Sequence, residues 1–178
     1  YKTYKFPIII TRCSNNYGPY QFPEKLIPLM IVNSIQEKDM PVYGKGNQIR
    51  DWIYVEDHVD AICEILKSGK IGEIYNIGGE SKLTNINVVK KISTLLDKKK
   101  PRKNNKSYFS LIKYVKDRPA HDKRYSVNIS KIRKEVKWKP KINFNYGIEK
   151  TVDWYLANET WWKLILKNSY SGERLGKL

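Results

Sequence analysis

Short runs of β-branched and aromatic residues alternate with segments of helical periodicity along this sequence. The apolar runs occupy 8–10, 52–55 and 73–77, and helices are predicted over 26–37 and 57–68 between them. Strands that alternate with helices pair in parallel, so the pattern predicts an α/β fold with a largely parallel sheet. Two or three strands make a poor sheet on their own, and we therefore expect the larger part of this sheet to lie outside the chain.

The helical periodicity predicts which side chains pack inward. In the helix expected from Asp57 onward, the residues at i, i+3, i+4 and i+7 that should form the buried face are Val59, Ile62, Cys63 and Leu66. Thr84 is predicted to be the N-cap of the next helix. The basic, polar segment 98–107 is predicted to be a disordered loop, and 147–166 to be one long helix.

The formal net charge of +16 raises the question of nucleic-acid binding. The densest basic cluster runs from Lys98 to Lys106, but the other lysines are spread along the whole chain, as a lysine-rich composition alone would produce. Nucleic acid is therefore a disfavoured partner. No apolar run approaches the roughly 18 residues that span a bilayer, so no membrane partner is expected. Cys13 and Cys63 lie in apolar surroundings without metal-ligand spacing, which favours a cytoplasmic protein with reduced thiols and no metal.

Eight motifs follow one another in the order typical of one enzyme family. They are TRCSNNYGPYQFPEKLIP (11–28), PVYGKG (41–46), IRDW (49–52), YVEDH (54–58), YNIGG (75–79), DRPAHDKRY (117–125), WKP (138–140) and TVDWY (151–155). In this succession the chain resembles the dTDP-glucose 4,6-dehydratases, which are extended short-chain dehydrogenases. The resemblance covers almost the whole chain outside the basic loop.

The resemblance implies the C-terminal part of such an enzyme. Residues 1–20 would be a strand and loop that complete a Rossmann-type parallel sheet. Residues 21–178 would be mainly a small mixed α/β substrate-binding domain, with 50–80 returning to the Rossmann sheet. The N-terminal NAD-binding domain would be absent, in keeping with a sequence that has no initiator methionine. The full-length enzyme would be a homodimer.

A nucleotide sugar presents a diphosphate, a flat base and a ring of hydroxyl groups. Arginine suits the diphosphate because its planar guanidinium holds two oxygens at once. Arg50 and Arg118 lie in polar stretches rich in turn residues, although each has an adjacent aspartate with which it could form a simple ion pair. The resemblance implies that both arginines and His121 line the diphosphate and ribose side of the ligand.

The resemblance also assigns the remaining ligand contacts. Residues 41–43 would lie along the base and its ribose, and Asn16 would lie near the nicotinamide end of NAD. The complete set of substrate-binding residues that it implies is Asn15, Lys25, Leu26, Pro41, Val42, Tyr43, Arg50, Asn76, Asp117, Arg118 and His121. His58, in the first turn of a predicted helix, and the tryptophans at 154, 161 and 162 are expected to have structural roles.

The catalytic parts that the family requires have no place in this chain. They are a Gly-rich dinucleotide turn, a Tyr with a Lys four residues later, and an Asp-Glu pair. Tyr1 and Lys5 have the Y-x-x-x-K spacing, but Pro7 and a strand follow at once and leave no room for the long helix that the pair needs. We therefore expect no catalytic residue here, NAD bound mainly by the absent half, and activity only as part of a longer chain.

Three alternatives to a dTDP-glucose 4,6-dehydratase of a rhamnose-type deoxysugar pathway remain. One is a UDP-glucose 4,6-dehydratase, because related dehydratases differ mainly in the base that they accept. Another is a non-catalytic remnant that has lost its cofactor half. The third is the basic nucleic-acid-binding module.

Overall fold

The computed structural model describes residues 1–168, which form two compact units. Unit 1 consists of 1–17, 49–83 and 124–147, and unit 2 consists of 18–48, 84–123 and the remaining residues from 148 onward. Each unit is therefore assembled from three separate stretches of the chain. The chain passes from one unit to the other five times, because the stretches of the two units alternate along the sequence.

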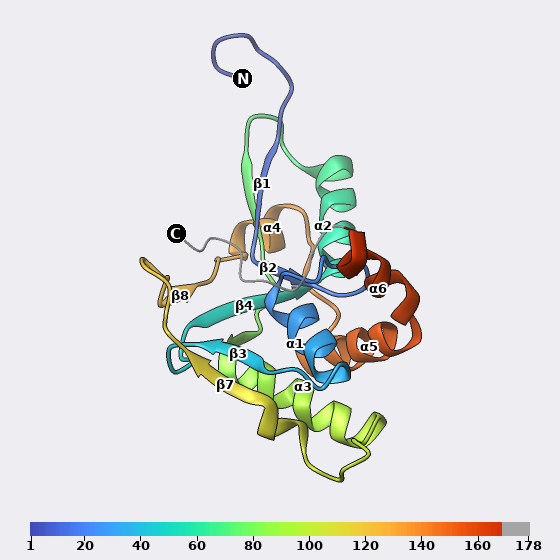
Figure 1. The fold of residues 1–178 in the computed structure, drawn as a ribbon. Coiled ribbons are helices and arrows are strands. Elements are labelled where there is room, and N and C mark those ends of the chain that lie inside the picture. Colours follow the sequence, from blue (N-terminus) through green and yellow to red (C-terminus); the bar gives the residue numbers. More distant parts are fainter. Residues whose placement is uncertain (169–178) are drawn as a thin grey trace. The chain divides into compact units, whose positions relative to one another are not determined.

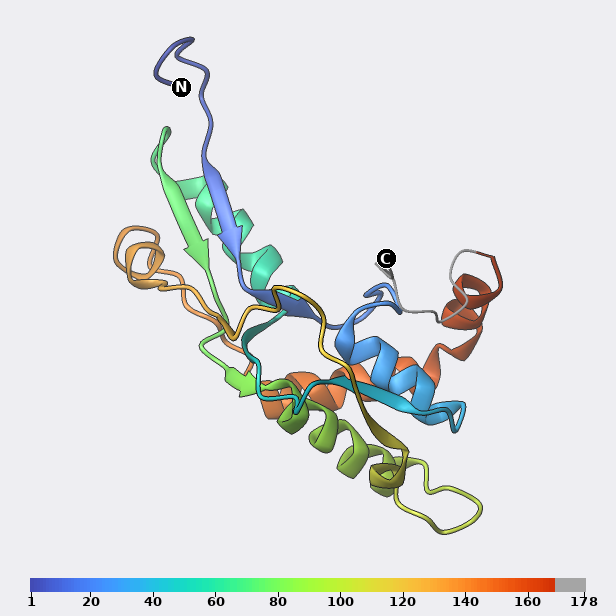
Figure 2. The ribbon, with the colours of Figure 1, turned by 60° about the vertical axis from the view of Figure 1, so that its left-hand side comes forward.

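Unit 1 contains short parallel strand pairs (Figures 1 and 2). Strand β1 (Ile10–Cys13) pairs with β5 (Ile74–Ile77), and β2 (Asn15–Tyr17) pairs with β4 (Ile49–Tyr54), both in parallel. Strand β4 also pairs with β6 (Lys82–Thr84) and, in parallel, with β8 (Arg124–Tyr125). Because β1 and β2 are separated only by Ser14, the chain changes from one sheet to the other at this residue.

The core of unit 1 lies between these strands and two helices, α2 (Val55–Ser68) and α4 (Ser130–Glu135). Its buried side chains come from β4, α2, β5 and the segment 129–138, and they are Ile53, Ala61, Ile65, Tyr75, Ile77, Ile129, Ile132, Val136 and Trp138. The buried core residues therefore come from two of the three stretches of unit 1, 49–83 and 124–147, and the stretch 1–17 contributes the partly buried Ile9 and Cys13.

The predicted buried face of α2 is wrong for Val59, Cys63 and Leu66, although Ile62 is partly buried against the core. Val59 is 54% exposed and Leu66 is 77% exposed, whereas the buried positions are Asp57, Ala61 and Ile65. Asp57 is not an N-cap either, because its carboxylate accepts hydrogen bonds from the backbone N–H groups of residues 141 and 142, at 3.1 and 2.8 Å. The buried stripe contains a carboxylate and an alanine, so a pattern of large apolar residues pointed to the wrong side of the helix.

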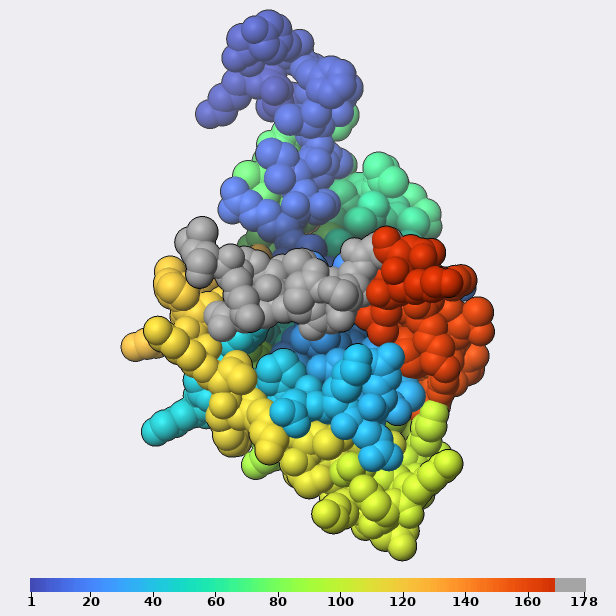
Figure 3. All heavy atoms as spheres, viewed as in Figure 1, coloured from blue at the N-terminus to red at the C-terminus, as the bar shows by residue number. Residues whose placement is uncertain are grey.

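The first strand also differs from the prediction. It begins at Ile10 rather than ending there, and Ile10 is 45% exposed where a buried strand was expected. Within the described residues β1 pairs along one edge only, with β5, so the outer edge of the strand remains uncovered. Residues before it are exposed as well: Tyr4 is 87% and Phe6 65% exposed, and this segment is coloured dark blue in Figure 3.

Unit 2 pairs β3 (Met40–Tyr43) in parallel with β7 (Ile112–Val115) and packs α1 (Leu26–Ile35) near α3 (Asn85–Lys99). Pro28 is tolerated in α1 because it lies in the first turn, where its missing N–H has no helical partner. Thr84 caps α3 as predicted, accepting a hydrogen bond from the Asn87 N–H at 3.3 Å. The predicted α/β class with parallel pairing is thus confirmed for both units.

The C-terminal helix is divided in two. Helix α5 (Phe144–Ala157) ends at Asn158, and α6 (Glu159–Asn168) follows directly. The Asn158 side chain donates a hydrogen bond to the Trp154 carbonyl at 2.8 Å, which ends the first helix by satisfying one of its last acceptors. Trp162 is fully buried and its indole N–H donates to the Tyr155 carbonyl at 3.0 Å, so the predicted packing role of this tryptophan is confirmed.

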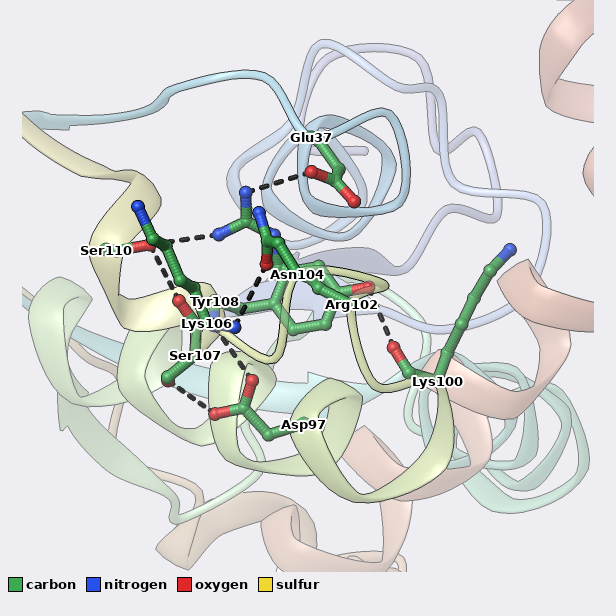
Figure 4. Close-up of polar contacts among 9 residues, drawn as sticks. All are labelled: Glu37, Asp97, Lys100, Arg102, Asn104, Lys106, Ser107, Tyr108 and Ser110. Carbon is green, nitrogen blue, oxygen red and sulfur yellow. Dashed lines mark hydrogen bonds and ion pairs between the residues drawn. The ribbon is translucent and has the colours of Figure 1, made fainter.

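The basic loop is ordered, contrary to the prediction (Figure 4). The Asp97 carboxylate accepts hydrogen bonds from the Ser107 hydroxyl at 2.6 Å and from the Tyr108 N–H at 2.8 Å. The Tyr108 hydroxyl returns across the loop to the Lys100 carbonyl at 2.8 Å, and the short helix η1 (Tyr108–Leu111) follows. Composition suggested disorder, but one carboxylate and one buried tyrosine close both ends of the loop.

Candidate functional site

The junction of β1 and β2 in unit 1 brings the two predicted asparagines together with a histidine. The Asn16 side-chain amide donates to the Ser14 carbonyl at 3.2 Å and to Cys13 Sγ at 3.3 Å. Its oxygen lies 2.8 Å from His58 Nδ1, in the first turn of α2. Asn15 Oδ1 is buried and lacks a hydrogen-bond partner among the described residues, so it is an acceptor available to a ligand.

Arg50 and Asp51 follow one another on β4 and are both buried. The Asp51 carboxylate accepts a hydrogen bond from the Ser81 N–H at 2.8 Å, while an Arg50 guanidinium nitrogen donates to the Ile49 carbonyl at 2.9 Å. Successive strand residues project to opposite faces, so this arrangement does not favour the simple Arg50–Asp51 ion pair that the sequence left open. Arg50 is therefore a buried cation that its neighbour does not neutralise from the same face.

Burial raises the pKa of the Asp51 carboxyl above its ordinary value of 3.8, despite the Ser81 N–H and the neighbouring Lys82, which both lower it. The folded state then binds this proton more tightly than the unfolded chain does. Its contribution to stability is complete below pH 3.8 and is lost as the pH rises through the raised pKa. The ionised form of Asp51 therefore destabilises unit 1 relative to the protonated form.

An Asp51→Asn variant should remove this pH dependence, because the amide oxygen can still accept from Ser81 without carrying a charge. The free energy of unfolding of the original chain, relative to the variant, should fall as the pH rises from 3.8, measured by urea denaturation at successive pH values. Asp60→Asn is a control of opposite sign, since the hydrogen bond from Lys141 lowers the pKa of Asp60. Parallel curves for the Asp51 pair would contradict the expectation.

Asn76 lies on β5 and is partly exposed. Its side-chain amide donates to the Asn128 carbonyl at 3.3 Å, a long bond that leaves the amide oxygen as an acceptor. The strand runs directly into Gly78 and Gly79, which are both buried. Unit 1 thus contains Asn15, Arg50 and Asn76 of the predicted substrate-binding set, together with Asn16.

In unit 2, the end of β3 meets the segment 117–121. Asp117 accepts hydrogen bonds from His121 Nδ1 at 2.7 Å and from Gln48 Nε2 at 2.8 Å, and the bond from His121 is the main reason why the pKa of Asp117 is lowered. The rings of Tyr43 and His121 meet edge to face at 6.3 Å. A side chain at Gly44, whose φ is +56°, would come within 3.0 Å of the Asp117 carboxylate, so a glycine is required at this turn.

These contacts unite three of the predicted residues of unit 2, namely Tyr43, Asp117 and His121. Arg118 is exposed, and its backbone N–H donates to the Asp117 carboxylate at 2.9 Å. Val42 is only 1% exposed, so this residue has almost no surface for contact with a ligand. Pro41, on the same strand, is only partly buried.

Lys25 and Leu26 lie at the start of α1. Lys25 is the N-cap residue, its side chain is exposed, and it forms an ion pair with Glu24. Leu26 opens the helix and is half-buried. The first turn of α1 contains no acidic residue, so the helix dipole makes this end positive, while the Glu24 carboxylate compensates the Lys25 ammonium beside it.

Unit 2 also contains a cavity that no sequence pattern indicated. It has a volume of about 330 Å³ and is lined by residues of α1, β3, β7 and α6, including Leu29, Val32, Asn33, Pro41 and Val115. The volume is at the lower end of the range for ligand pockets. Among the described residues, Pro41 is its only member from the predicted substrate-binding set, and no arginine lines it to bind a diphosphate.

Three cations of the basic loop are engaged within unit 2. Lys99 pairs with Asp153 at 2.8 Å and Lys100 with Glu159 at 2.7 Å. The Arg102 side chain is only 8% exposed and contacts Glu37 at 2.9 Å, as Figure 4 shows. Basic side chains that are paired with carboxylates offer less charge to a phosphate backbone, so the nucleic-acid alternative loses its main support.

Among the described residues, Tyr1 and Lys5 do not form the helical Y-x-x-x-K pair of the family. Tyr1 and Lys5 lie in a single turn closed by a backbone hydrogen bond of 2.9 Å, not on a long helix. The hydrogen bonds of the Asn16 amide go to Cys13, Ser14 and His58. Both cysteines are free, and among residues 1–168 there is no cluster of side chains suited to a metal ion and no helix long and apolar enough to cross a membrane.

Three comparisons place the chain among known proteins. It is 52% identical over 177 residues to a probable dTDP-glucose 4,6-dehydratase of Sinorhizobium fredii, covering 99% of this chain and 50% of that protein. Its structure matches a crystal structure of dTDP-glucose 4,6-dehydratase from Bacillus anthracis in complex with NAD, with a TM-score of 0.83 and 50% identity. That match covers 93% of this chain and 50% of the other.

A dTDP-glucose 4,6-dehydratase of Streptomyces venezuelae, also solved with NAD, matches with a TM-score of 0.84 and 40% identity over 92% of this chain and 48% of its own. The chain thus spans about half the length of the curated relatives that it matches. These neighbours are extended short-chain dehydrogenases, which confirms the fold expected from the motifs. The family model for GDP-mannose 4,6 dehydratase matches residues 1–151, and the chain belongs to this family.

Proposed function

We propose that this chain is the sugar-nucleotide-binding half of a dTDP-glucose 4,6-dehydratase. The observation that carries the proposal is the match of at least 98% of the chain, at 51 to 53% identity, to five dTDP-glucose 4,6-dehydratases of which it spans half. The presence of buried Arg50 and of the unpartnered Asn15 oxygen supports it, since a nucleotide sugar offers a diphosphate and several hydroxyl groups.

Each unit contributes its own part to binding in this proposal. In unit 1, Arg50 and Asn76 bind diphosphate oxygens and Asn15 accepts a hydrogen bond from the sugar. In unit 2, Arg118 and His121 bind on the diphosphate and ribose side, with Asp117 holding the imidazole through its hydrogen bond of 2.7 Å. Pro41 and Tyr43 lie along the base, with Val42 between them, and Lys25 and Leu26 contact the nucleotide.

The reaction itself depends on parts that these residues do not supply. NAD, when bound in the complete enzyme, would supply the acceptor and donor for the hydride that moves from C4 to C6 of the glucose, and Asn16 would lie near its nicotinamide end. The side chains of this chain bind and orient the substrate. We therefore propose that the chain alone is inactive, that the complete enzyme is a cytoplasmic homodimer, and that units 1 and 2 correspond broadly to the Rossmann and substrate-binding parts.

Competition binding tests the proposal. The chain should bind dTDP-glucose and dTDP, and UDP should displace dTDP only at higher concentration, as followed by isothermal titration calorimetry. Equal or stronger binding of UDP would favour the UDP-glucose alternative. Failure to bind either nucleotide, while the chain remains folded by circular dichroism, would contradict the proposal. Formation of a 4-keto-6-deoxy sugar by the purified chain would contradict the predicted inactivity.

A further inference from the structure

His58 contacts the β1–β2 junction from a different element. Asn16 lies on β2, His58 lies in the first turn of α2, and their side chains meet at 2.8 Å. The same Asn16 amide reaches back to Cys13, the last residue of β1, and to Ser14, where the chain changes sheets. Asn16 therefore connects α2 to the junction, and all the residues involved belong to unit 1.

The partners of Asn16 determine the proton position on His58. The Ser14 carbonyl can only accept a hydrogen bond, so the Asn16 atom that faces it at 3.2 Å is the amide nitrogen. The atom that faces His58 is then the amide oxygen, which can only accept. The His58 Nδ1 must therefore carry the proton and donate it to Asn16 Oδ1.

Burial favours the uncharged form of this ring, because it lowers the pKa of His58 below the ordinary value of 6.5. Neutral imidazole has one N–H, and here the hydrogen bond assigns it to Nδ1. His58 is thus a fixed single donor to Asn16 near neutral pH. This bond leaves Nε2 as the unprotonated nitrogen.

Asn15 is the residue that this arrangement affects. It lies between Ser14 and Asn16 in the sequence, and the Asn16 amide is hydrogen-bonded to the Ser14 carbonyl. The Asn15 side chain projects to the face of β2 opposite to that of Asn16. Its buried oxygen has no partner among the described residues and therefore requires a donor. A sugar hydroxyl is such a donor, whereas a fully ionised diphosphate is not.

We propose that His58 is a positioning residue that, through Asn16, fixes the β1–β2 junction and orients the Asn15 amide oxygen toward a hydroxyl of the sugar nucleotide. This inference rests on the proposed function for the identity of the ligand, but not for the hydrogen bonds. It gives His58 a role in binding, although His58 itself does not contact the ligand.

The ring nitrogens of the unmodified chain give the first test. The chain has two histidines, so a ¹⁵N-labelled sample gives two sets of ring signals, which a His58 variant assigns. His58 should show a protonated Nδ1 and an unprotonated Nε2 at neutral pH. The opposite tautomer, with the proton on Nε2, would overturn the proposal without any variant having to fold.

Two substitutions test the consequence for Asn15. His58→Leu removes the donor, and His58→Asn places an amide N–H near the position of Nδ1. His58→Leu should shift the side-chain amide signals of Asn15 and Asn16 and weaken dTDP-glucose binding about tenfold, the effect of leaving one buried polar group unpaired. His58→Asn should restore most of the affinity. Asp60→Ala, which removes hydrogen bonds on the same helix, should leave both unchanged.

The outcomes separate this proposal from the proposed function. If the original chain binds no sugar nucleotide, the proposed function fails, and the Asn15 amide signals alone decide whether His58 positions it. If the original chain binds dTDP-glucose and His58→Leu binds it equally well, the function stands and the positioning role is wrong. Equal losses in His58→Leu and Asp60→Ala would also overturn it, since a general loss of helix stability would explain both.

Discussion

Replacing Gly79 with alanine is expected to prevent unit 1 from folding. A Cβ built at this position would lie 1.8 Å from the Trp52 carbonyl oxygen, 2.6 Å from its carbon and 2.8 Å from Ile53 Cα. All three are backbone atoms of β4, the strand that pairs with β2, β6 and β8. No side-chain rotation relieves such contacts, so the strand itself would have to move.

The expected cost is more than about 4 kcal/mol, in the range of the most damaging single substitutions. A domain is stable by only about 5 to 15 kcal/mol, so Gly79→Ala should abolish the cooperative unfolding transition of unit 1 or lower its midpoint steeply. Thermal denaturation followed by circular dichroism measures this effect. Amide hydrogen exchange in β4 and β5 shows whether it is confined to unit 1.

Gly78→Ala is the matched control. Its Cβ would meet the Asp51 carboxylate at 2.7 Å and a Val127 methyl at 2.8 Å, which are side-chain atoms that can shift. We expect this variant to fold with a moderate loss of stability, of about 1 to 3 kcal/mol, as for other overpacked core positions. Equal effects of the two substitutions would contradict the assignment of the damage at Gly79 to the β4 backbone.

The second large effect is expected on ligand affinity when Arg50 is replaced. Arg50 is 7% exposed, and in the proposed function it binds the diphosphate. Removing one partner of a buried, hydrogen-bonded charge pair costs about 2 to 5 kcal/mol, so Arg50→Ala should weaken dTDP-glucose binding by at least about 30-fold. Arg50→Lys should recover only part of this loss, because an ammonium group lacks the planar fork that holds two oxygens.

Arg102→Ala distinguishes ligand binding from the general effect of losing a buried arginine. The Arg102 side chain is 8% exposed and bonds to Glu37 and Ser110, so its loss should lower stability. The affinity for dTDP-glucose should not change. If Arg50→Ala binds the nucleotide sugar as tightly as the original chain does, Arg50 has a structural role and its place in the proposed site is wrong.

Regular elements were largely predictable from the sequence because apolar runs and turn residues mark them locally. Strands β4 and β5 overlap the short apolar runs that predicted them, and Thr84 caps α3 as its position before a periodic segment indicated. These features depend on neighbours in the sequence. The motifs added the family and the site residues, which periodicity could not supply.

What escaped prediction depends on contacts between distant residues. The buried stripe of α2 includes Asp57, whose carboxylate is satisfied by backbone groups more than 80 positions later. The basic loop is ordered by Asp97 and Tyr108, and the composition of the loop gives no sign of their role. The bond between Asn16 and His58 spans 42 positions, so His58 was expected to be no more than structural.

The interleaving of the two units has a consequence for synthesis on the ribosome. Unit 1 starts with the first residues of the chain, but its core includes Ile129, Ile132, Val136 and Trp138. The early strands must therefore wait, with their apolar faces uncovered, until residues 129–138 have been translated. A nascent chain of this kind exposes apolar surface for longer than one whose units are each continuous in sequence, and such exposed surface promotes aggregation.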